Sequence, residues 1–285
     1  MSTPSWAPSQ TSFSTSERKV MRTMPRRAGG WVKRSFDVVT SLVLLVLLSP
    51  LLLLCGAAVW VADGWPVLFR HERVGRYGRR FHVVKFRTMD HTGGGDLTVA
   101  GDPRVTATGR LLRRHKLDEL PQLWNVLVGE MSFVGPRPEV ARYVAMYARP
   151  YRTIHQLRPG ITDFASLAFR DEEQLLYAHT ADAGFYERVL LPRKLALARL
   201  YRRRYSWWLD ARLMLATICT APGLDSVATL LMGPVLARRA RAGLNGAPPR
   251  SPASGTDRGN GSGGTGSRQA GDVGWTEVVA AADGR

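Results

Sequence analysis

The stretch Leu111–Pro138, LLRRHKLDELPQLWNVLVGEMSFVGPRP, organises the chain and places an acidic pair, Asp118 and Glu119, between two groups of cations. Pro121, which a helix tolerates only in its first turn, follows the pair. Apolar residues then recur at helical spacing: Leu120, Leu123, Trp124, Leu127 and Val128. The pattern predicts a helix that begins near Asp118.

Asp118 has two readings at this position. It can cap the helix by accepting a hydrogen bond from a backbone N–H group, which is the commonest use of such an aspartate. Alternatively, a helix N-terminus with arginines nearby can hold phosphate, and a carboxylate there can attack the phosphorus. The neighbouring cations that favour this second reading are Arg113, Arg114, Lys116 and Arg137.

The overall charge is strongly basic. The 285 residues include 40 lysines and arginines against 23 acidic residues, a formal charge of +17. This excess predicts an anionic partner: nucleic acid, anionic lipid or a phosphorylated substrate. No known nucleic-acid motif is found.

Cys55 and Cys219 lie in apolar stretches, which argues against a disulfide framework. The six histidines are scattered, which argues against a zinc hydrolase.

The uncharged segment Val38–Ala62, between Asp37 and Asp63, predicts a membrane element. Its length fits a spanning helix, whereas a secretory signal would be shorter and nearer the N-terminus. Pro50 falls midway and removes a backbone hydrogen bond, and Ser49 can bond a freed carbonyl. Lysines and arginines flank both ends, and basic flanks stay cytoplasmic. These features favour a re-entrant helix–break–helix over a crossing.

Two short strands are predicted after this segment, Val67–Arg73 and Phe81–Thr88, around a glycine turn at Gly75–Gly78. Lys85 alternates with apolar neighbours in the second strand. It either points into a site or, as is more usual for a strand lysine, faces solvent.

Three stretches follow Pro138. Glu139–Thr162 predicts an amphipathic helix and then a turn at Pro159–Gly160. Tyr186–Arg204 predicts a helix with one apolar side and one arginine-rich side. Tyr205–Leu224 combines a tryptophan pair with an apolar run, and it reads either as an interfacial helix against anionic lipid or as a buried core helix.

Five motifs together carry a resemblance: KRSFD at 33–37, Ser49-Pro50, KFRTM at 85–89, LDELPQ at 117–122 and MSFVGPRP at 131–138. In this order they resemble the bacterial sugar transferase family, the monotopic phosphoglycosyl transferases that initiate surface glycan assembly on a polyprenyl phosphate carrier. The resemblance runs from about Lys33 to about Thr220, and several spaced motifs make it more specific than any single one.

The resemblance implies transfer of a sugar 1-phosphate from a UDP-sugar to polyprenyl (undecaprenyl) phosphate with release of UMP. This would be the first membrane step of exopolysaccharide, capsule, O-antigen or glycoprotein glycan synthesis. Carried over by position, Asp118 is the nucleophile that forms an aspartyl sugar phosphate, and Glu119 is a ligand of Mg²⁺. Lys85, Arg113 and Arg137 would surround the phosphates, which need such neutralisation during phosphoryl transfer.

The expected fold is α+β and predominantly helical: a monotopic membrane protein with a re-entrant hairpin, a small β-hairpin and amphipathic interfacial helices. Residues 1–30 read as a disordered basic lead, 31–65 as the membrane hairpin, 66–240 as a cytosolic catalytic domain and 241–285 as a disordered tail rich in Gly, Ser and Pro. The resemblance places the protein at the bacterial inner membrane, with its catalytic domain on the cytoplasmic face. The expected partners are the UDP-sugar, the polyprenyl phosphate and anionic lipid, but no nucleic acid.

Two positions depart from the family pattern. Asp163 follows Pro-Gly-Ile-Thr, where members often have glycine, and Ala198 stands where some members have an acidic residue of the site.

The rival interpretation is a non-catalytic, membrane-tethered protein whose basic surface binds lipid or nucleic acid. Metal-dependent release of UMP from a UDP-sugar discriminates the two, because a binding module cannot produce it.

Overall fold

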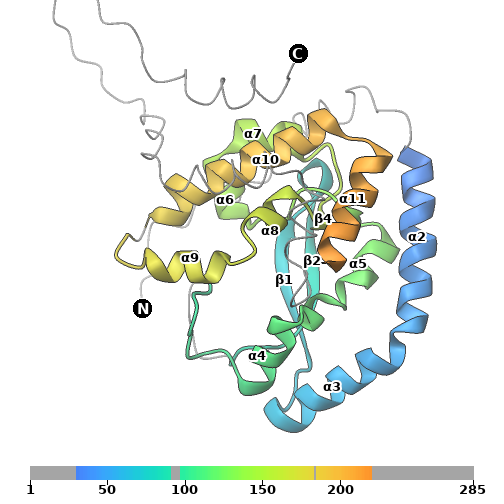
Figure 1. Cartoon of the computed structure of the whole chain (residues 1–285), viewed down its shortest axis with the longest axis vertical. Coiled ribbons are helices and arrows are strands. Elements are labelled where there is room, and N and C mark those ends of the chain that lie inside the picture. Colours follow the sequence, from blue (N-terminus) through green and yellow to red (C-terminus); the bar gives the residue numbers. More distant parts are fainter. Residues whose placement is uncertain (1–29, 91–96, 183, 220–285) are drawn as a thin grey trace, which may run out of the picture.

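The computed structural model describes residues 30–90, 97–182 and 184–219, which form a mainly helical α+β fold (Figure 1). The predicted tail at 241–285 and all of the predicted lead except Gly30 lie outside these residues. In chain order the elements are α2 (Gly30–Leu47), α3 (Ser49–Asp63), β1 (Leu68–Val74), a 3₁₀ turn (Arg76–Gly78), β2 (Arg80–Phe86), α4 (Ala107–Arg114), a 3₁₀ turn (Leu117–Glu119), α5 (Gln122–Val128), β3 (Ser132–Val134), α6 (Ala141–Met146), α7 (Ala148–Ile154), β4 (Gly160–Thr162), α8 (Phe164–Ala168), α9 (Glu172–Ala178), a π turn (Tyr186–Leu190), α10 (Leu191–Arg204) and α11 (Trp207–Ile218).

The apolar segment forms two helices, α2 and α3, bent by 62° at the predicted break. Ser49 Oγ donates a hydrogen bond of 2.7 Å to the carbonyl of Val46, as predicted for a serine beside a helix break. Pro50 lies in the first turn of α3, where a helix tolerates proline, and it has no N–H group to donate to the Val46 carbonyl that Ser49 bonds. In the described part of the chain no single helix is long and apolar enough to cross a membrane. The bent pair passes that test by length and composition only.

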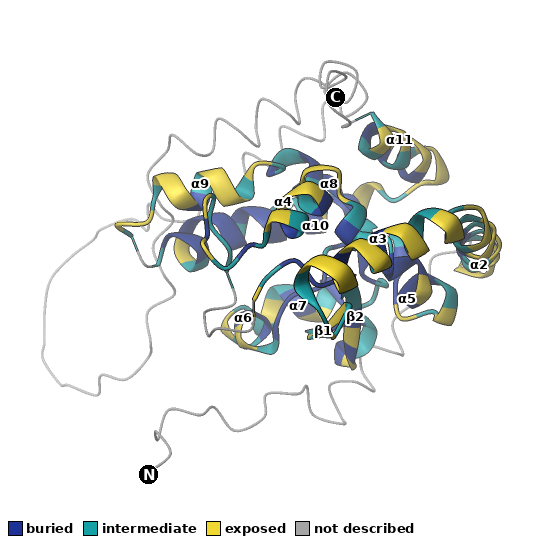
Figure 2. Ribbon diagram, turned by 90° about the horizontal axis from the view of Figure 1, so that it is seen from below, coloured by how far each residue is buried: buried dark blue, intermediate teal, exposed yellow. Residues whose placement is uncertain are grey.

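The bent pair lies along the outside of the molecule and exposes most of its apolar surface (Figure 2). On its inner side, Cys55 and Val59 of α3 pack against Phe86 and Leu112. The exposed apolar side chains include Trp31, Val39, Leu42, Val43, Val46, Leu47, Leu53, Leu54, Trp60 and Val61. An apolar surface this extensive marks a contact with another apolar phase or partner.

Polar residues fix the start of α2 to the rest of the fold. Arg34 donates to the carbonyls of Val126 (2.6 Å) and Leu127 (2.7 Å) in the last turn of α5, where carbonyls have no partner one turn further along the helix. Lys33 donates to the Val134 carbonyl (3.0 Å) and pairs with Asp210. The bent pair is therefore anchored to the globular part by charge as well as by apolar packing.

The predicted β-hairpin is present. β1 and β2 pair antiparallel from Leu68 opposite Phe86 to Val74 opposite Arg80, within two residues of the predicted ends. The side chain of Asn125 joins α5 to this hairpin, because its Nδ2 donates to the His82 carbonyl (2.8 Å) and its Oδ1 accepts from the Val84 amide (3.0 Å). The helix that follows the acidic pair is thus held against strand β2.

A second small sheet pairs β3 and β4 in parallel. The two strands meet closely: a Cβ atom on Gly160 would lie 2.1 Å from the Gly135 amide nitrogen, so only glycine fits there. The sequence predicted only a turn at Pro159–Gly160, and that assignment was incomplete because Gly160 already belongs to β4.

The prediction of one amphipathic helix after Pro138 was wrong. The chain forms α6 and α7, separated at Tyr147 with φ −121° and ψ 46°. Pro150 has no N–H group to donate to the Met146 carbonyl, so a continuous helix cannot pass this point. Both helices pack on α10 in the largest buried apolar cluster, which includes Tyr143, Val144, Ile154, Leu190, Leu191 and Leu195.

Helix α11 (Trp207–Ile218) combines features of the two predicted alternatives, an interfacial helix and a buried core helix. Leu213 and Ala216 are buried against the core, whereas Trp208 and Ile218 are exposed. The helix therefore closes the core on one side and presents apolar side chains to the outside on the other.

Candidate functional site

The acidic pair lies in the 3₁₀ turn that connects α4 to α5. Lys116, immediately before this turn, has the left-handed backbone conformation (φ 56°), which ends α4 and redirects the chain. Helix α5 itself begins at Gln122. The capping interpretation of Asp118 was therefore wrong, because no cap hydrogen bond from a side chain is present at the start of this turn or of α5.

Asp118 is a buried carboxylate, with 7% of its surface exposed. Its Oδ1 atom is inaccessible and has no hydrogen-bond partner among the described residues. Burial raises the pKa of Asp118, and the positive charge of Lys85 partly opposes this rise. An unsatisfied buried carboxylate oxygen is costly to a fold and calls for an explanation. A bound substrate group or cation that completes its coordination would supply one.

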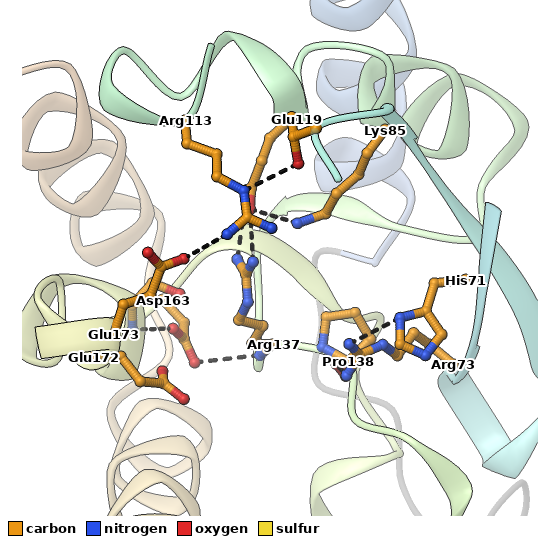
Figure 3. Close-up of polar contacts among 12 residues, drawn as sticks. His71, Arg73, Lys85, Arg113, Glu119, Arg137, Pro138, Asp163, Glu172 and Glu173 are labelled. Carbon is orange, nitrogen blue, oxygen red and sulfur yellow. Dashed lines mark hydrogen bonds and ion pairs between the residues drawn. The ribbon is translucent and has the colours of Figure 1, made fainter. Parts of the chain in front are cut away.

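Glu119 faces two cations at once (Figure 3). Its Oε1 atom accepts from Lys85 Nζ at 2.7 Å and from Arg137 Nη2 at 2.6 Å. Burial alone would raise the pKa of Glu119, but Arg137 and then Lys85 outweigh it and hold the pKa well below its usual range. Glu119 therefore stays ionised, and Lys85 points into the site and not to solvent.

Arg137 is presented by the loop that follows β3. The carbonyl of Pro138, its neighbour, accepts from Arg73 Nη1 at 3.4 Å. Glu139 then accepts from Tyr186 OH at 2.8 Å and lies 3.4 Å from Lys194 Nζ. The loop is thus fixed to the hairpin and to α10, while the Arg137 side chain extends to Glu119.

Arg113 stands apart from the other predicted phosphate ligands. Its Nε donates to Thr88 Oγ1 (3.0 Å), and its Nη1 pairs with Glu173 Oε1 (2.9 Å) at the start of α9. Its charge still reaches Asp118, whose pKa it lowers slightly after the larger effects of burial and Lys85. The structure thus brings Lys85, Glu119 and Arg137 together and leaves Arg113 at the edge of the site.

Sequence reasoning missed a group of charges beside the site. Lys194 of α10 bonds both oxygens of Glu172 (3.2 Å each) and lies beside Glu139. Burial would lower the pKa of Lys194, but Glu172 and Glu139 raise it above its usual value. Three consecutive acidic residues, Asp171–Glu173, were the one signal in the sequence that could have indicated this group of charges. Their partners, however, are 22 or more residues away in the chain.

Both positions that depart from the family pattern reach this region. Asp163 and Ala198 line a small cavity together with Arg137 and Lys194. Asp163 is 2% exposed and Ala198 6%. They are therefore buried neighbours of the site and not surface substitutions.

The acidic pair fits a hard divalent cation. In the described residues, no group of three or more His, Cys, Asp or Glu side chains is placed to hold a metal. Mg²⁺, however, usually takes only one or two carboxylates and completes its shell with water and substrate phosphates. Within the described ranges, Asp118 Oδ1 has no hydrogen-bond partner, and Glu119 Oε2 has one long contact of 3.5 Å, from Arg137. Each carboxylate of the pair thus keeps one oxygen that makes no short hydrogen bond in the described structure.

The sequence is similar to those of known proteins. The sequence profile described as "Bacterial sugar transferase" matches residues 28–222. The chain is 33% identical over 210 residues to the UDP-N-acetylgalactosamine-undecaprenyl-phosphate N-acetylgalactosaminephosphotransferase of Aeromonas hydrophila (72% of this chain, 47% of the relative). It is 39% identical over 199 residues to the undecaprenyl-phosphate glucose phosphotransferase of Komagataeibacter xylinus (65% and 35%). It is 40% identical over 165 residues to the exopolysaccharide production protein ExoY of Rhizobium meliloti (52% and 73%).

The match spans less than half the length of the first two relatives. Those two act on different sugars by name, so the similarity does not single out one sugar. The profile match covers well over half of this chain, including every motif of the site. The chain belongs to the bacterial sugar transferase family.

Proposed function

We propose that this protein moves a sugar 1-phosphate from a UDP-sugar to polyprenyl phosphate through a covalent intermediate on Asp118. The observation that carries the proposal is the buried Asp118 carboxylate, whose Oδ1 has no partner in the described structure although cations lie close by. The names of the relatives, which combine undecaprenyl phosphate with sugar phosphotransfer, support the substrate classes.

The proposed reaction has two displacements at one phosphorus. The Asp118 carboxylate attacks the β-phosphorus of the UDP-sugar, and the bond from that phosphorus to the bridging oxygen breaks, with its electron pair leaving on UMP. An oxygen of polyprenyl phosphate then attacks the aspartyl sugar phosphate. The Asp118 carboxylate is released and a polyprenyl diphosphate sugar forms.

The residues around Asp118 support these steps electrostatically. Burial raises the pKa of Asp118, and a more basic carboxylate is a better nucleophile while Lys85 helps to keep it ionised. Lys85 and Arg137 are directed at Glu119 and would neutralise a diphosphate bound beside it. Glu119 would hold Mg²⁺, which neutralises phosphate charge when bound. Arg113 would exchange Glu173 for a donor phosphate.

We further propose that α2 and α3 enter the cytoplasmic face of the bacterial plasma membrane as a re-entrant hairpin. The 62° bend, the exposed apolar surface and the cationic residues beyond both ends support this placement. The exposed apolar side of α11, with Trp208, would rest in the interface against anionic lipid.

A substrate screen tests the reaction. We expect membranes that contain the full chain to release UMP from at least one of a panel of UDP-sugars when polyprenyl phosphate and Mg²⁺ are present. Chelation of Mg²⁺ should remove the activity. A luminescent UMP assay and thin-layer detection of the glycolipid product measure both halves of the reaction.

Matched membranes without the chain are the control for background hydrolysis. The rival interpretation, a basic lipid- or nucleic-acid-binding protein, predicts no release of UMP from any donor. Absence of release across the whole panel, with the protein folded and inserted, would contradict the proposed function.

Single-cysteine labelling tests the hairpin. Ser35→Cys and Phe69→Cys, in a chain with Cys55 and Cys219 replaced by serine, place one thiol before and one after the apolar segment Val38–Ala62. Because a re-entrant hairpin returns to the side it entered, both thiols should react with an impermeant maleimide only in inverted vesicles. Reaction of the two thiols from opposite faces would show that the segment crosses the membrane.

A further inference from the structure

Asp163 has no role in the proposed chemistry, yet it is one of the most buried charged residues of the described chain (2% exposed). It follows β4 and precedes α8, and each of its carboxylate oxygens accepts one backbone N–H group. Oδ1 accepts from the Ser166 amide at 2.7 Å, which caps α8. Oδ2 accepts from the Arg137 amide at 3.2 Å. One side chain therefore joins the start of a helix to the residue that carries a site cation.

The reason for this contact lies in the pairing of β3 and β4. The Gly135 amide donates to the Thr162 carbonyl, and the Gly160 amide donates to the Pro136 carbonyl, both at 3.1 Å. Pro136 has no N–H group, so this backbone pairing cannot continue through it. Arg137 supplies the next N–H group, and Asp163 accepts it with a side-chain oxygen where no strand carbonyl does.

The backbone at Arg137 and Pro138 is then held at two points. Asp163 holds its N–H group, and Arg73 holds the carbonyl of Pro138 at 3.4 Å. From this fixed backbone the guanidinium extends to Glu119 Oε1 at 2.6 Å. Because a side chain can be directed only as well as its backbone is fixed, the contact at Asp163 bears on the position of the guanidinium.

We propose that Asp163 is a positioning residue of the transfer reaction: by holding the Arg137 amide, it directs the Arg137 guanidinium to Glu119 and to the diphosphate. The inference rests on the proposed function. Its alternative is purely structural, in which Asp163 only caps α8 and the contact with Arg137 has no consequence for turnover.

Asp163→Asn separates the two. Asparagine caps helices as well as aspartate does, so its Oδ1 can still accept from the Ser166 amide. The other position then holds an NH₂ group that faces the Arg137 N–H group, donor against donor. We expect kcat for UMP release to fall about tenfold to a hundredfold, because small displacements of a phosphate ligand cost that much. The thermal unfolding midpoint should also fall, because the Arg137 N–H group is left buried without an acceptor, so kcat is measured well below that temperature.

Ser206→Ala is the matched control. Ser206 caps α11 by accepting from the Leu209 amide at 3.1 Å, and it does not contact Arg137. This variant loses a helix cap of the same kind and should keep wild-type kcat. If Asp163→Asn also keeps wild-type kcat, or if Ser206→Ala loses as much, the positioning role is excluded.

A double-mutant cycle tests whether Asp163 acts through Arg137. The affinity of the full chain for UDP is measured in the wild type, Asp163→Asn, Arg137→Ala and the double variant. We expect each single variant to bind UDP more weakly and the double variant to bind no more weakly than Arg137→Ala. If the two losses of UDP affinity multiply in the double variant, Asp163 and Arg137 act independently and the proposal is overturned. A wild-type chain that releases no UMP would refute the proposed function instead, so the two failures are distinguishable.

Discussion

Asp118→Asn is expected to lower the rate of UMP release by at least about a thousandfold and to abolish the covalent sugar-phosphate adduct. The amide keeps the size of the side chain but cannot attack phosphorus. Asp118 Oδ1 has no partner among the described residues, so no hydrogen bond seen there is lost with the charge. Burial destabilises the charged form of Asp118, and the variant should therefore be at least as stable as the wild type.

Intact-protein mass spectrometry after donor is added without acceptor measures the adduct, and peptide mapping places it. Asp171→Asn is the control, because it makes the same change at an exposed carboxylate at the start of α9. It should keep both the adduct and the activity. An adduct mapped to another side chain, or full turnover in Asp118→Asn, would contradict the assignment of the nucleophile.

Glu119→Gln should have the second largest effect, and it should change stability as well as rate. The wild-type carboxylate holds Lys85 and Arg137 on one oxygen, Oε1. Without the negative charge these two cations repel each other, and the free energy of unfolding should fall by on the order of 2 kcal/mol. Loss of the proposed Mg²⁺ ligand and of cation positioning should lower kcat about a hundredfold or more. Denaturant unfolding and UMP release measure the two effects.

Glu72→Gln is the control on the same hairpin. Glu72 pairs with Arg80 at 2.8 Å, but both side chains are more than a third exposed (46% and 37%). Exposed pairs contribute little, so both stability and rate should stay close to the wild type. If Glu72→Gln and Glu119→Gln changed stability and rate equally, the two cations on Glu119 Oε1 would contribute no more than an exposed ion pair, which would contradict the prediction.

Local signals in the sequence predicted much of this fold. The break at Ser49–Pro50 follows from the missing N–H group of proline, and the hairpin follows from its glycine turn between alternating strands. The inward direction of Lys85 could only be offered as one of two readings. Strand alternation predicts which residues share a face of the hairpin, but not which face is covered. That depends on contacts with Asn125 and Glu119, more than 30 residues away in the chain.

The pairing of β3 with β4 could not be predicted. Each strand has three residues, too few for a periodic pattern, and more than 20 residues separate them. The contacts that depend on this pairing were missed for the same reason, above all the one between Asp163 and the Arg137 amide. Asp118 was expected at the helix start because apolar spacing predicts helices to within a few residues. The left-handed Lys116 and the 3₁₀ turn, however, moved the start of α5 to Gln122.

Helix α5 links the two parts of the molecule on which the proposed reaction depends. It starts three residues after Glu119, and its last carbonyls are bound by Arg34 of α2. Seven residues at 1.5 Å each make this helix about 10 Å long. If α2 lies in lipid as proposed, its depth would set the height of the Asp118 carboxylate above the bilayer. In the proposed reaction, a carrier phosphate would then have to reach that one level, whatever the number of isoprene units beneath it.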